Sequence, residues 1–138
     1  MNERRNIAIL GSTGSIGRQT LDIMSEYPTL FRPWLLTANS SADLLIEQAR
    51  KYMPKHVVIA CEDLYEKVRD SLTGLPISVH SGRAAIAQLV TDDEVDTVVT
   101  AMVGYSGLES TIAAIKANKN IALANKETLV VAGELITK

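Results

Sequence analysis

A glycine-rich segment, GSTGSIG at residues 11–17, has residue types and a spacing that indicate chemistry. It follows an apolar run and precedes an amphipathic stretch, so we expect it to join a β-strand to the start of an α-helix. Free backbone N–H groups and the positive end of the helix dipole bind phosphates at such a position. Glycines such as Gly11 and Gly14 let the chain turn sharply beside a ligand, and Thr13 and Ser15 add hydroxyl groups. The segment favours dinucleotide binding; the alternative is a tight turn that binds no ligand.

The segment after the second apolar run bears on the choice of nucleotide. NAD sites usually place an Asp or Glu there, where it binds the ribose hydroxyls. This sequence has Asn39, Ser40 and Ser41 instead. The missing carboxylate removes repulsion against a 2′-phosphate, and three small polar groups can donate to it, which favours NADP over NAD. No Arg or Lys stands at this strand end, and Ser41 alternatively acts as the N-cap of the next helix.

Two further segments follow apolar runs in the last third of the chain. AMVGYSG, residues 101–107, contains two glycines that would let the backbone pass close to a nicotinamide ring, or that simply form a flexible loop. Asn125, Lys126 and Glu127 follow the last apolar run. Asn125 can hydrogen-bond a ribose or carboxamide, and Lys126 offers a cation to an anionic substrate. Glu127 can be explained without a ligand, because a carboxylate at the start of a helix is favoured by the helix dipole.

These segments are positioned by a repeated pattern of a short apolar run, a turn and an amphipathic stretch. The apolar runs are residues 6–10, 33–38, 56–60, 77–80, 95–103 and 120–124. Their continuous apolar character indicates strands that are buried on both faces. Helical patterns between them stop at Pro28, Pro54 and Gly74, and a last helix is expected over residues 127–137. The pattern predicts an α/β, Rossmann-like, doubly wound fold, with a mainly parallel sheet and helices on both faces.

Composition narrows the class of protein further. The chain has 138 residues, 46% of them hydrophobic, and a net charge of −2 without a basic block, which argues against nucleic acid as a partner. No stretch reaches membrane-spanning length, so no membrane partner is expected. The single cysteine, Cys61, cannot form an internal disulfide, which indicates a cytoplasmic location. His56 and His80 belong to no recognisable motif, so neither is assigned to a metal or to catalysis.

The motifs together carry a resemblance. IAILGSTGSIGRQTLDI, TAMVGYSGL and ALANKETLVVAG resemble the N-terminal domain of the 1-deoxy-D-xylulose 5-phosphate reductoisomerase family, over essentially the whole chain. The residues that the resemblance assigns to the NADPH phosphates are Thr13, Gly14, Ser15 and Ile16. It also places Asn125 and Glu127 at the cofactor and Lys126 at the sugar phosphate substrate. Where that family often has a Gly-Lys-Asn-like stretch, this chain has residues 39–41, so the NADPH preference is implied mainly by the family.

The resemblance also implies a reaction that needs more than this segment. Members of the family rearrange 1-deoxy-D-xylulose 5-phosphate and reduce the product with NADPH to 2-C-methyl-D-erythritol 4-phosphate, in non-mevalonate isoprenoid biosynthesis. A divalent metal, Mg²⁺ or Mn²⁺, is bound by a central domain downstream of ANKE, and the full-length proteins are homodimers. We therefore expect residues 1–138 to be a truncated NADPH-binding domain, with no catalytic or metal-binding residue of its own and no activity alone.

Two other interpretations are compatible with the residues. One is another two-domain NAD(P)-dependent dehydrogenase, of the dihydrodipicolinate reductase or semialdehyde dehydrogenase kind. The other is a non-catalytic module that senses a nucleotide or binds coenzyme A. Comparative binding of NADPH, NADH and coenzyme A distinguishes them.

Overall fold

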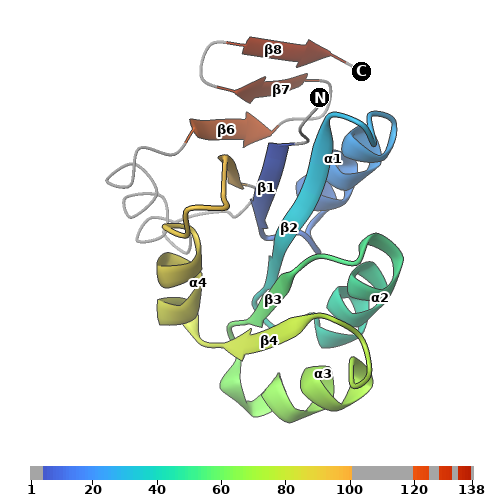
Figure 1. Cartoon of the computed structure of the whole chain (residues 1–138). Coiled ribbons are helices and arrows are strands. Elements are labelled where there is room, and N and C mark those ends of the chain that lie inside the picture. The colour runs from blue at the N-terminus through green and yellow to red at the C-terminus, as the bar shows by residue number, and fades with distance from the viewer. Residues whose placement is uncertain (1–4, 101–119, 125–127, 132–133, 138) are drawn as a thin grey trace.

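Strands and helices alternate along most of the chain, as the computed structural model shows (Figure 1). The structure describes residues 5–100, 120–124, 128–131 and 134–137. The strands are β1 (Arg5–Leu10), β2 (Phe31–Ala38), β3 (His56–Ile59), β4 (Ser78–Ser81), β5 (Thr97–Thr100), β6 (Asn120–Ala124), β7 (Thr128–Val131) and β8 (Glu134–Thr137). The helices are α1 (Ser15–Ser25), α2 (Ala42–Tyr52), α3 (Tyr65–Ser71) and α4 (Arg83–Leu89), with a 3₁₀ turn, η1 (Glu62–Leu64), before α3.

The strands form one sheet in the order β4-β3-β2-β1-β5-β6-β7-β8. Neighbours from β4 to β6 are parallel, whereas β7 pairs antiparallel with β6 and with β8. The expected helix over residues 127–137 is therefore wrong. The β-branched residues of this segment favour strands, and the antiparallel pairing of β7 with β8 places Val131 opposite Glu134. The mainly parallel sheet is confirmed.

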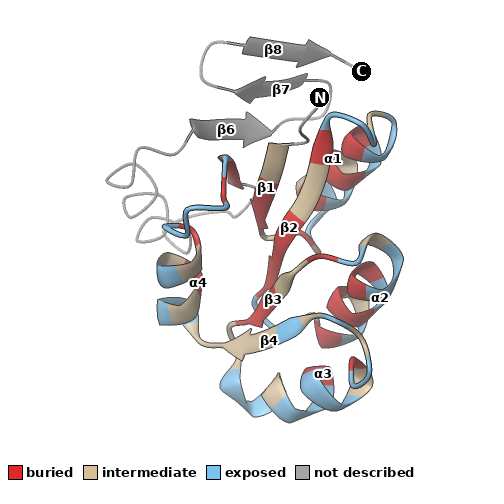
Figure 2. Cartoon of the chain, viewed as in Figure 1, coloured by how far each residue is buried: buried red, intermediate tan, exposed pale blue. Residues whose placement is uncertain are grey.

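Two apolar clusters lie on the two faces of the sheet, because successive strand residues point to opposite sides. On β1, Ile7 and Ile9 join the cluster that α1, α2 and α3 cover, whereas Ala8 and Leu10 join the cluster that α4 covers. Figure 2 shows the buried residues along β1, β2 and β3 and on α1 and α2. The continuous apolar runs of the sequence thus correspond to strands covered on both faces, which confirms the doubly wound arrangement.

The helices end where the stop signals of the sequence predict, but the predicted N-cap of α2 makes no side-chain hydrogen bond. α1 ends before Pro28 and α2 ends before Pro54. Met53 closes α2 in a left-handed conformation, with φ of 50°, and its N–H donates to the carbonyl of Ala49 at 2.9 Å. Ser41 occupies the N-cap position of α2, but its hydroxyl makes no capping hydrogen bond and is exposed.

No helix in the described part of the chain is long and apolar enough to cross a membrane.

Candidate dinucleotide-binding site

The glycine-rich loop connects β1 to α1, as its sequence predicts. Gly11 has φ of 83°, a left-handed conformation that side chains rarely adopt, so glycine is required where the chain leaves β1. The N–H of Gly14 donates to the carbonyl of Gly11 at 3.2 Å, and the N–H of Arg18 donates to the carbonyl of Gly14 at 2.9 Å. The chain therefore turns tightly and enters the helix within four residues.

Gly17 explains the third glycine of the segment. A Cβ atom at this position would lie 2.2 Å from the carbonyl oxygen of Gly11 and 2.6 Å from Cα of Ser12. Both are backbone atoms, so only glycine lets α1 pack this closely against the loop that precedes it. Close packing of this kind is the role of the third glycine in dinucleotide-binding loops.

The start of α1 can accept an anion. Gly14 is its N-cap, no side chain caps the helix, and its first turn contains no acidic residue. The first N–H groups of an α-helix have no partner within the helix, and the helix dipole adds positive potential there. Gly14 and Ser15 are exposed, whereas Thr13 and Ile16 are half-buried. These features fit a nucleotide pyrophosphate.

A second loop ends at the same edge of the sheet. Asn39, Ser40 and Ser41 directly follow β2, which is the parallel neighbour of β1, and all three are exposed. The N–H of Ala42 donates to the carbonyl of Ser40 at 2.9 Å, which closes the turn into α2. The structure therefore brings the two predicted loops together, side by side at the carboxyl ends of β1 and β2.

A buried hydrogen-bond network holds the glycine-rich loop to β2 and α2. Gln48 donates to the carbonyl of Ser12 at 2.7 Å and accepts a bond from the Ser12 hydroxyl at 2.8 Å. Thr37 accepts a bond from the N–H of Gly11 at 2.9 Å. Ser12, Thr37 and Gln48 are all buried. No motif of the sequence pointed to Gln48, although a Gln on the otherwise apolar face of a helix is a signal that a buried polar contact exists.

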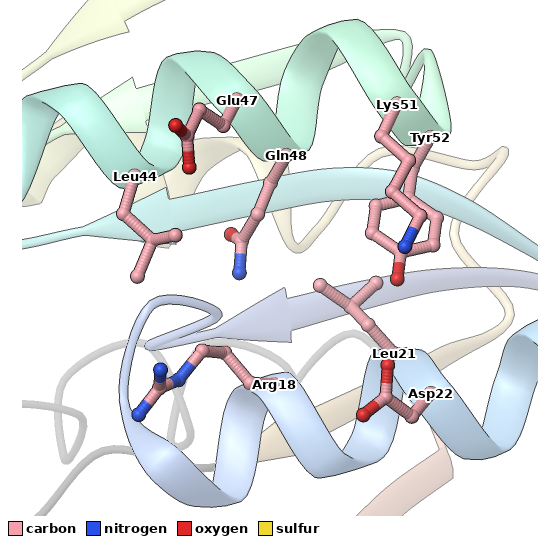
Figure 3. Close-up of a pocket in the computed structure, with 8 residues that line it drawn as sticks. All are labelled: Arg18, Leu21, Asp22, Leu44, Glu47, Gln48, Lys51 and Tyr52. Carbon is pink, nitrogen blue, oxygen red and sulfur yellow. The ribbon is translucent and has the colours of Figure 1, made fainter.

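A cavity of about 250 Å³ extends from this network between α1 and α2. The eight side chains that line it are Arg18, Leu21, Asp22, Leu44, Glu47, Gln48, Lys51 and Tyr52 (Figure 3). It follows the two helices rather than the strand ends, and no residue of the glycine-rich loop lines it.

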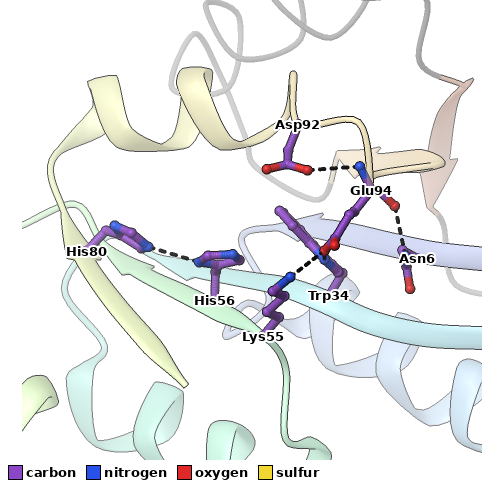
Figure 4. A network of polar contacts seen from close by, with 7 residues as sticks. All are labelled: Asn6, Trp34, Lys55, His56, His80, Asp92 and Glu94. Carbon is purple, nitrogen blue, oxygen red and sulfur yellow. Dashed lines mark hydrogen bonds and ion pairs between the residues drawn. The ribbon is translucent and has the colours of Figure 1, made fainter. Parts of the chain in front are cut away.

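The two histidines contact each other, although the sequence indicated no partner for either. His56 Nδ1 lies 3.0 Å from His80 Nε2, because neighbouring strands β3 and β4 place the rings on one face of the sheet (Figure 4). Burial lowers the pKa of both rings, and for His56 the nearby charges of His80 and Lys55 lower its pKa further. Trp34 packs on His56 with ring centroids 4.6 Å apart. His56 begins its strand, so it lies toward the sheet edge opposite the loops.

Beside the histidines, Glu94 joins three parts of the chain. Its carboxylate accepts hydrogen bonds from the indole N–H of Trp34 at 2.9 Å and from Lys55 Nζ at 2.7 Å (Figure 4). The hydrogen bond from Lys55, and to a smaller extent the one from Trp34, lowers the pKa of Glu94. Together with a bond from the Asn6 side chain to the Glu94 carbonyl, these contacts fix the segment that leads into β5.

The remaining predicted site residues lie outside the described residues. These are Asn125, Lys126 and Glu127, together with the glycines of the 101–107 segment. Among the residues that the structure describes, no group of three or more His, Cys, Asp or Glu side chains is arranged to hold a metal ion. Cys61 is half-buried and has a free thiol.

The loops lie at the topological switch point of the sheet. The chain runs outward from β1 through β2, β3 and β4, and then returns to the other side of β1 as β5. Nucleotides bind in the crevice at such a point, beyond the carboxyl ends of the strands. Fold and site together define a Rossmann-like domain of the dinucleotide-binding class.

Comparison with known proteins identifies the family within this class. The family model described as 1-deoxy-D-xylulose 5-phosphate reductoisomerase matches residues 7–133, and the chain therefore belongs to the 1-deoxy-D-xylulose 5-phosphate reductoisomerase family. The reductoisomerase of Porphyromonas gingivalis is 62% identical over 135 residues, which cover 98% of this chain and 35% of that protein. The chain spans about a third of the length of the curated relatives that it matches, 36% and 35% for two of them.

Solved structures of reductoisomerases share the fold of this chain. The reductoisomerase of Zymomonas mobilis in complex with NADPH superimposes with a TM-score of 0.83 at 33% identity, over 89% of this chain and 32% of that one. A DOX-P reductoisomerase in complex with NADPH, fosmidomycin and magnesium superimposes with a TM-score of 0.81 at 39% identity, over 85% of this chain and 29% of that one. The predicted family and fold are both confirmed.

Proposed function

We propose that this chain is the NADPH-binding domain of a 1-deoxy-D-xylulose 5-phosphate reductoisomerase. The uncapped start of α1, behind the glycine-rich loop at the switch point, is the observation that carries the proposal. The residues proposed to hold the NADPH phosphates are Gly11, Thr13, Gly14, Ser15 and Ile16. Asn39, Ser40 and Ser41 bind the ribose and its 2′-phosphate, since their exposed side chains lie beside that loop.

For the other end of the cofactor, the proposal depends on family membership. Asn125 and Glu127 bind the nicotinamide half of NADPH, and Lys126 binds the anionic sugar phosphate. The order of the sheet supports this assignment, because these residues follow β6, which is the second parallel strand on the far side of β1. The rival dehydrogenases of other families are disfavoured, because the family match extends over residues 7–133.

We further propose that the whole protein converts 1-deoxy-D-xylulose 5-phosphate to 2-C-methyl-D-erythritol 4-phosphate as a cytoplasmic homodimer, without a nucleic-acid or membrane partner. NADPH supplies the hydride for the reduction, and Mg²⁺ or Mn²⁺ is held by residues outside this chain. The 138-residue chain is then inactive alone, since it spans only about a third of its relatives. A reductoisomerase assay with the substrate, NADPH and Mg²⁺ tests this, and turnover by this chain would contradict it.

Nucleotide binding can be tested by adding one negative charge at the phosphate site. Ser15→Asp places a carboxylate in the first turn of α1, where it favours the helix but repels phosphate. We expect it to weaken NADPH binding at least about tenfold, as measured by nucleotide fluorescence. Gln88→Glu is the matched control, because it adds the same charge at an exposed position of α4, on the other face of the sheet.

The outcomes separate the proposal from its rivals. Saturable binding of NADPH that only Ser15→Asp weakens supports the proposal. Equal binding of the parent chain and Ser15→Asp, or tighter binding of coenzyme A than of NADPH, would contradict it. Urea unfolding of each variant shows that the fold is retained, because Asp at a helix start is stabilising.

A further inference from the structure

Arg18 lies beside both loops of the proposed cofactor site. It stands one turn into α1, is exposed, and lines the cavity between α1 and α2. Figure 3 shows its guanidinium group extending beside the loop before α1, across from Leu44, whereas Lys51 lies at the other end of the cavity. Leu44 follows Ser41 by three residues, so the guanidinium faces the gap between the glycine-rich loop and the loop after β2.

The charge of Arg18 is available for a ligand. Among the described residues, its guanidinium forms no ion pair or hydrogen bond, although the carboxylates of Asp22 and Glu47 line the same cavity. By contrast, Lys67 and Lys55 are engaged in ion pairs with Asp43 and Glu94 at 2.8 and 2.7 Å. An arginine that has no partner among the described residues is notable beside a proposed phosphate site, because its planar group matches phosphate oxygens in a two-point contact.

The nearest acid at the end of β2 is already paired. Asp43 is the only acidic residue in the first turn of α2, and its carboxylate binds Lys67 of α3 at 2.8 Å. A carboxylate that is free to bind both ribose hydroxyls is the usual mark of an NAD site. Arg18 of α1 therefore provides a cation beside the end of β2, where the acid of the first turn of α2 is paired with a lysine, and this charge arrangement suits a 2′-phosphate.

We propose that Arg18 binds the 2′-phosphate of NADPH and sets the preference for NADPH over NADH. Residues 39–41 contribute neutral donors but no cation, so the positive charge that recognises the phosphate comes from α1 rather than from the end of β2. This inference rests on the proposed function, because it names the residue that discriminates between nucleotides at that same site.

The test compares two substitutions that each remove one positive charge from the same cavity. Arg18→Met keeps an unbranched side chain that suits a helix, and Lys51→Met is the matched control at the other end. Dissociation constants for NADPH and NADH are measured by nucleotide fluorescence on the 138-residue chain. We expect Arg18→Met to weaken NADPH binding about tenfold to a hundredfold and to change NADH binding less than about twofold. Lys51→Met should change neither, and Arg18→Lys should restore part of the loss.

Each alternative result has a distinct meaning. Equal weakening of NADPH and NADH would show that Arg18 supports the pyrophosphate or the fold, which overturns the inference. An unchanged NADPH affinity in Arg18→Met would overturn it as well. If the parent chain unfolds cooperatively but binds neither nucleotide, the proposed function fails and the inference fails with it, a result that is visible before any substitution is made.

Discussion

Replacing Gly17 with Ala adds one Cβ atom at the closest approach of α1 to the glycine-rich loop. The added atom would lie 2.2 Å from the carbonyl oxygen of Gly11, and 2.6 and 2.8 Å from Cα and the carbonyl carbon of Ser12. Because all three neighbours are backbone atoms, no side-chain rotation relieves the overlap. The helix and the loop must separate, which also disturbs the proposed phosphate site.

The expected magnitude follows from two opposing effects. Ala is favoured over Gly inside a helix by about 1 kcal/mol, whereas overpacking costs about 1–3 kcal/mol. Since backbone atoms must move, we take the upper end and expect a net loss of about 2 kcal/mol in the free energy of unfolding. Gly14→Ala is the control, because its Cβ would lie 3.6 Å from the Gly11 oxygen, an ordinary contact. Its weaker N-cap should cost less than about 1 kcal/mol.

Urea unfolding measures both variants, with Trp34 as the probe. Trp34 is the only tryptophan in the sequence, and its side chain is fully buried, so its emission changes when the chain unfolds. For a slope of about 2 kcal/mol per molar urea, the midpoint of Gly17→Ala should fall by about 1 M. A midpoint equal to or above that of the parent chain, with the slope unchanged, would refute the close contact between helix and loop.

Three further predictions use the same unfolding assay. Gln48→Met should lower the free energy of unfolding by about 1–3 kcal/mol, because it leaves buried polar groups of the loop without partners, whereas Gln88→Met at an exposed site should change it little. The hydrogen bond from Lys55 lowers the pKa of Glu94 in the folded state, so ionised Glu94 adds to the free energy of unfolding at pH values above its ordinary pKa of 4.5. This contribution is lost as pH falls through the lowered pKa, and Glu94→Gln should therefore reduce the fall in the free energy of unfolding over that acidic range. Burial lowers the pKa of the paired histidines, so the free energy of unfolding should decrease as pH falls below 6.5. If the free energy of unfolding of His80→Gln decreases as steeply with falling pH as that of the parent chain, this prediction is contradicted.

Much of the fold could be predicted from local patterns. Continuous apolar runs indicated strands with both faces covered, and prolines marked the ends of α1 and α2, because both signals act within a few residues. The segment at residues 127–137 was predicted wrongly. Its apolar spacing suits a helix, but β-branched residues and pairing on β6 favour strands, and strand pairing depends on residues that are distant in the sequence.

The sequence by itself determined where a phosphate could bind. Gly11, Gly14 and Gly17 fall between an apolar run and a helix, and local backbone geometry requires glycine at Gly11, which has a positive φ, and at Gly17, which has no room for a Cβ atom. Only the tertiary structure decided what surrounds that loop. Gln48 reaches Ser12 from another helix, across 36 positions of sequence. Whether Arg18 has a partner among the described residues likewise depends on how α1 and α2 pack, since side-chain partners across elements are set by packing and not by neighbouring residues.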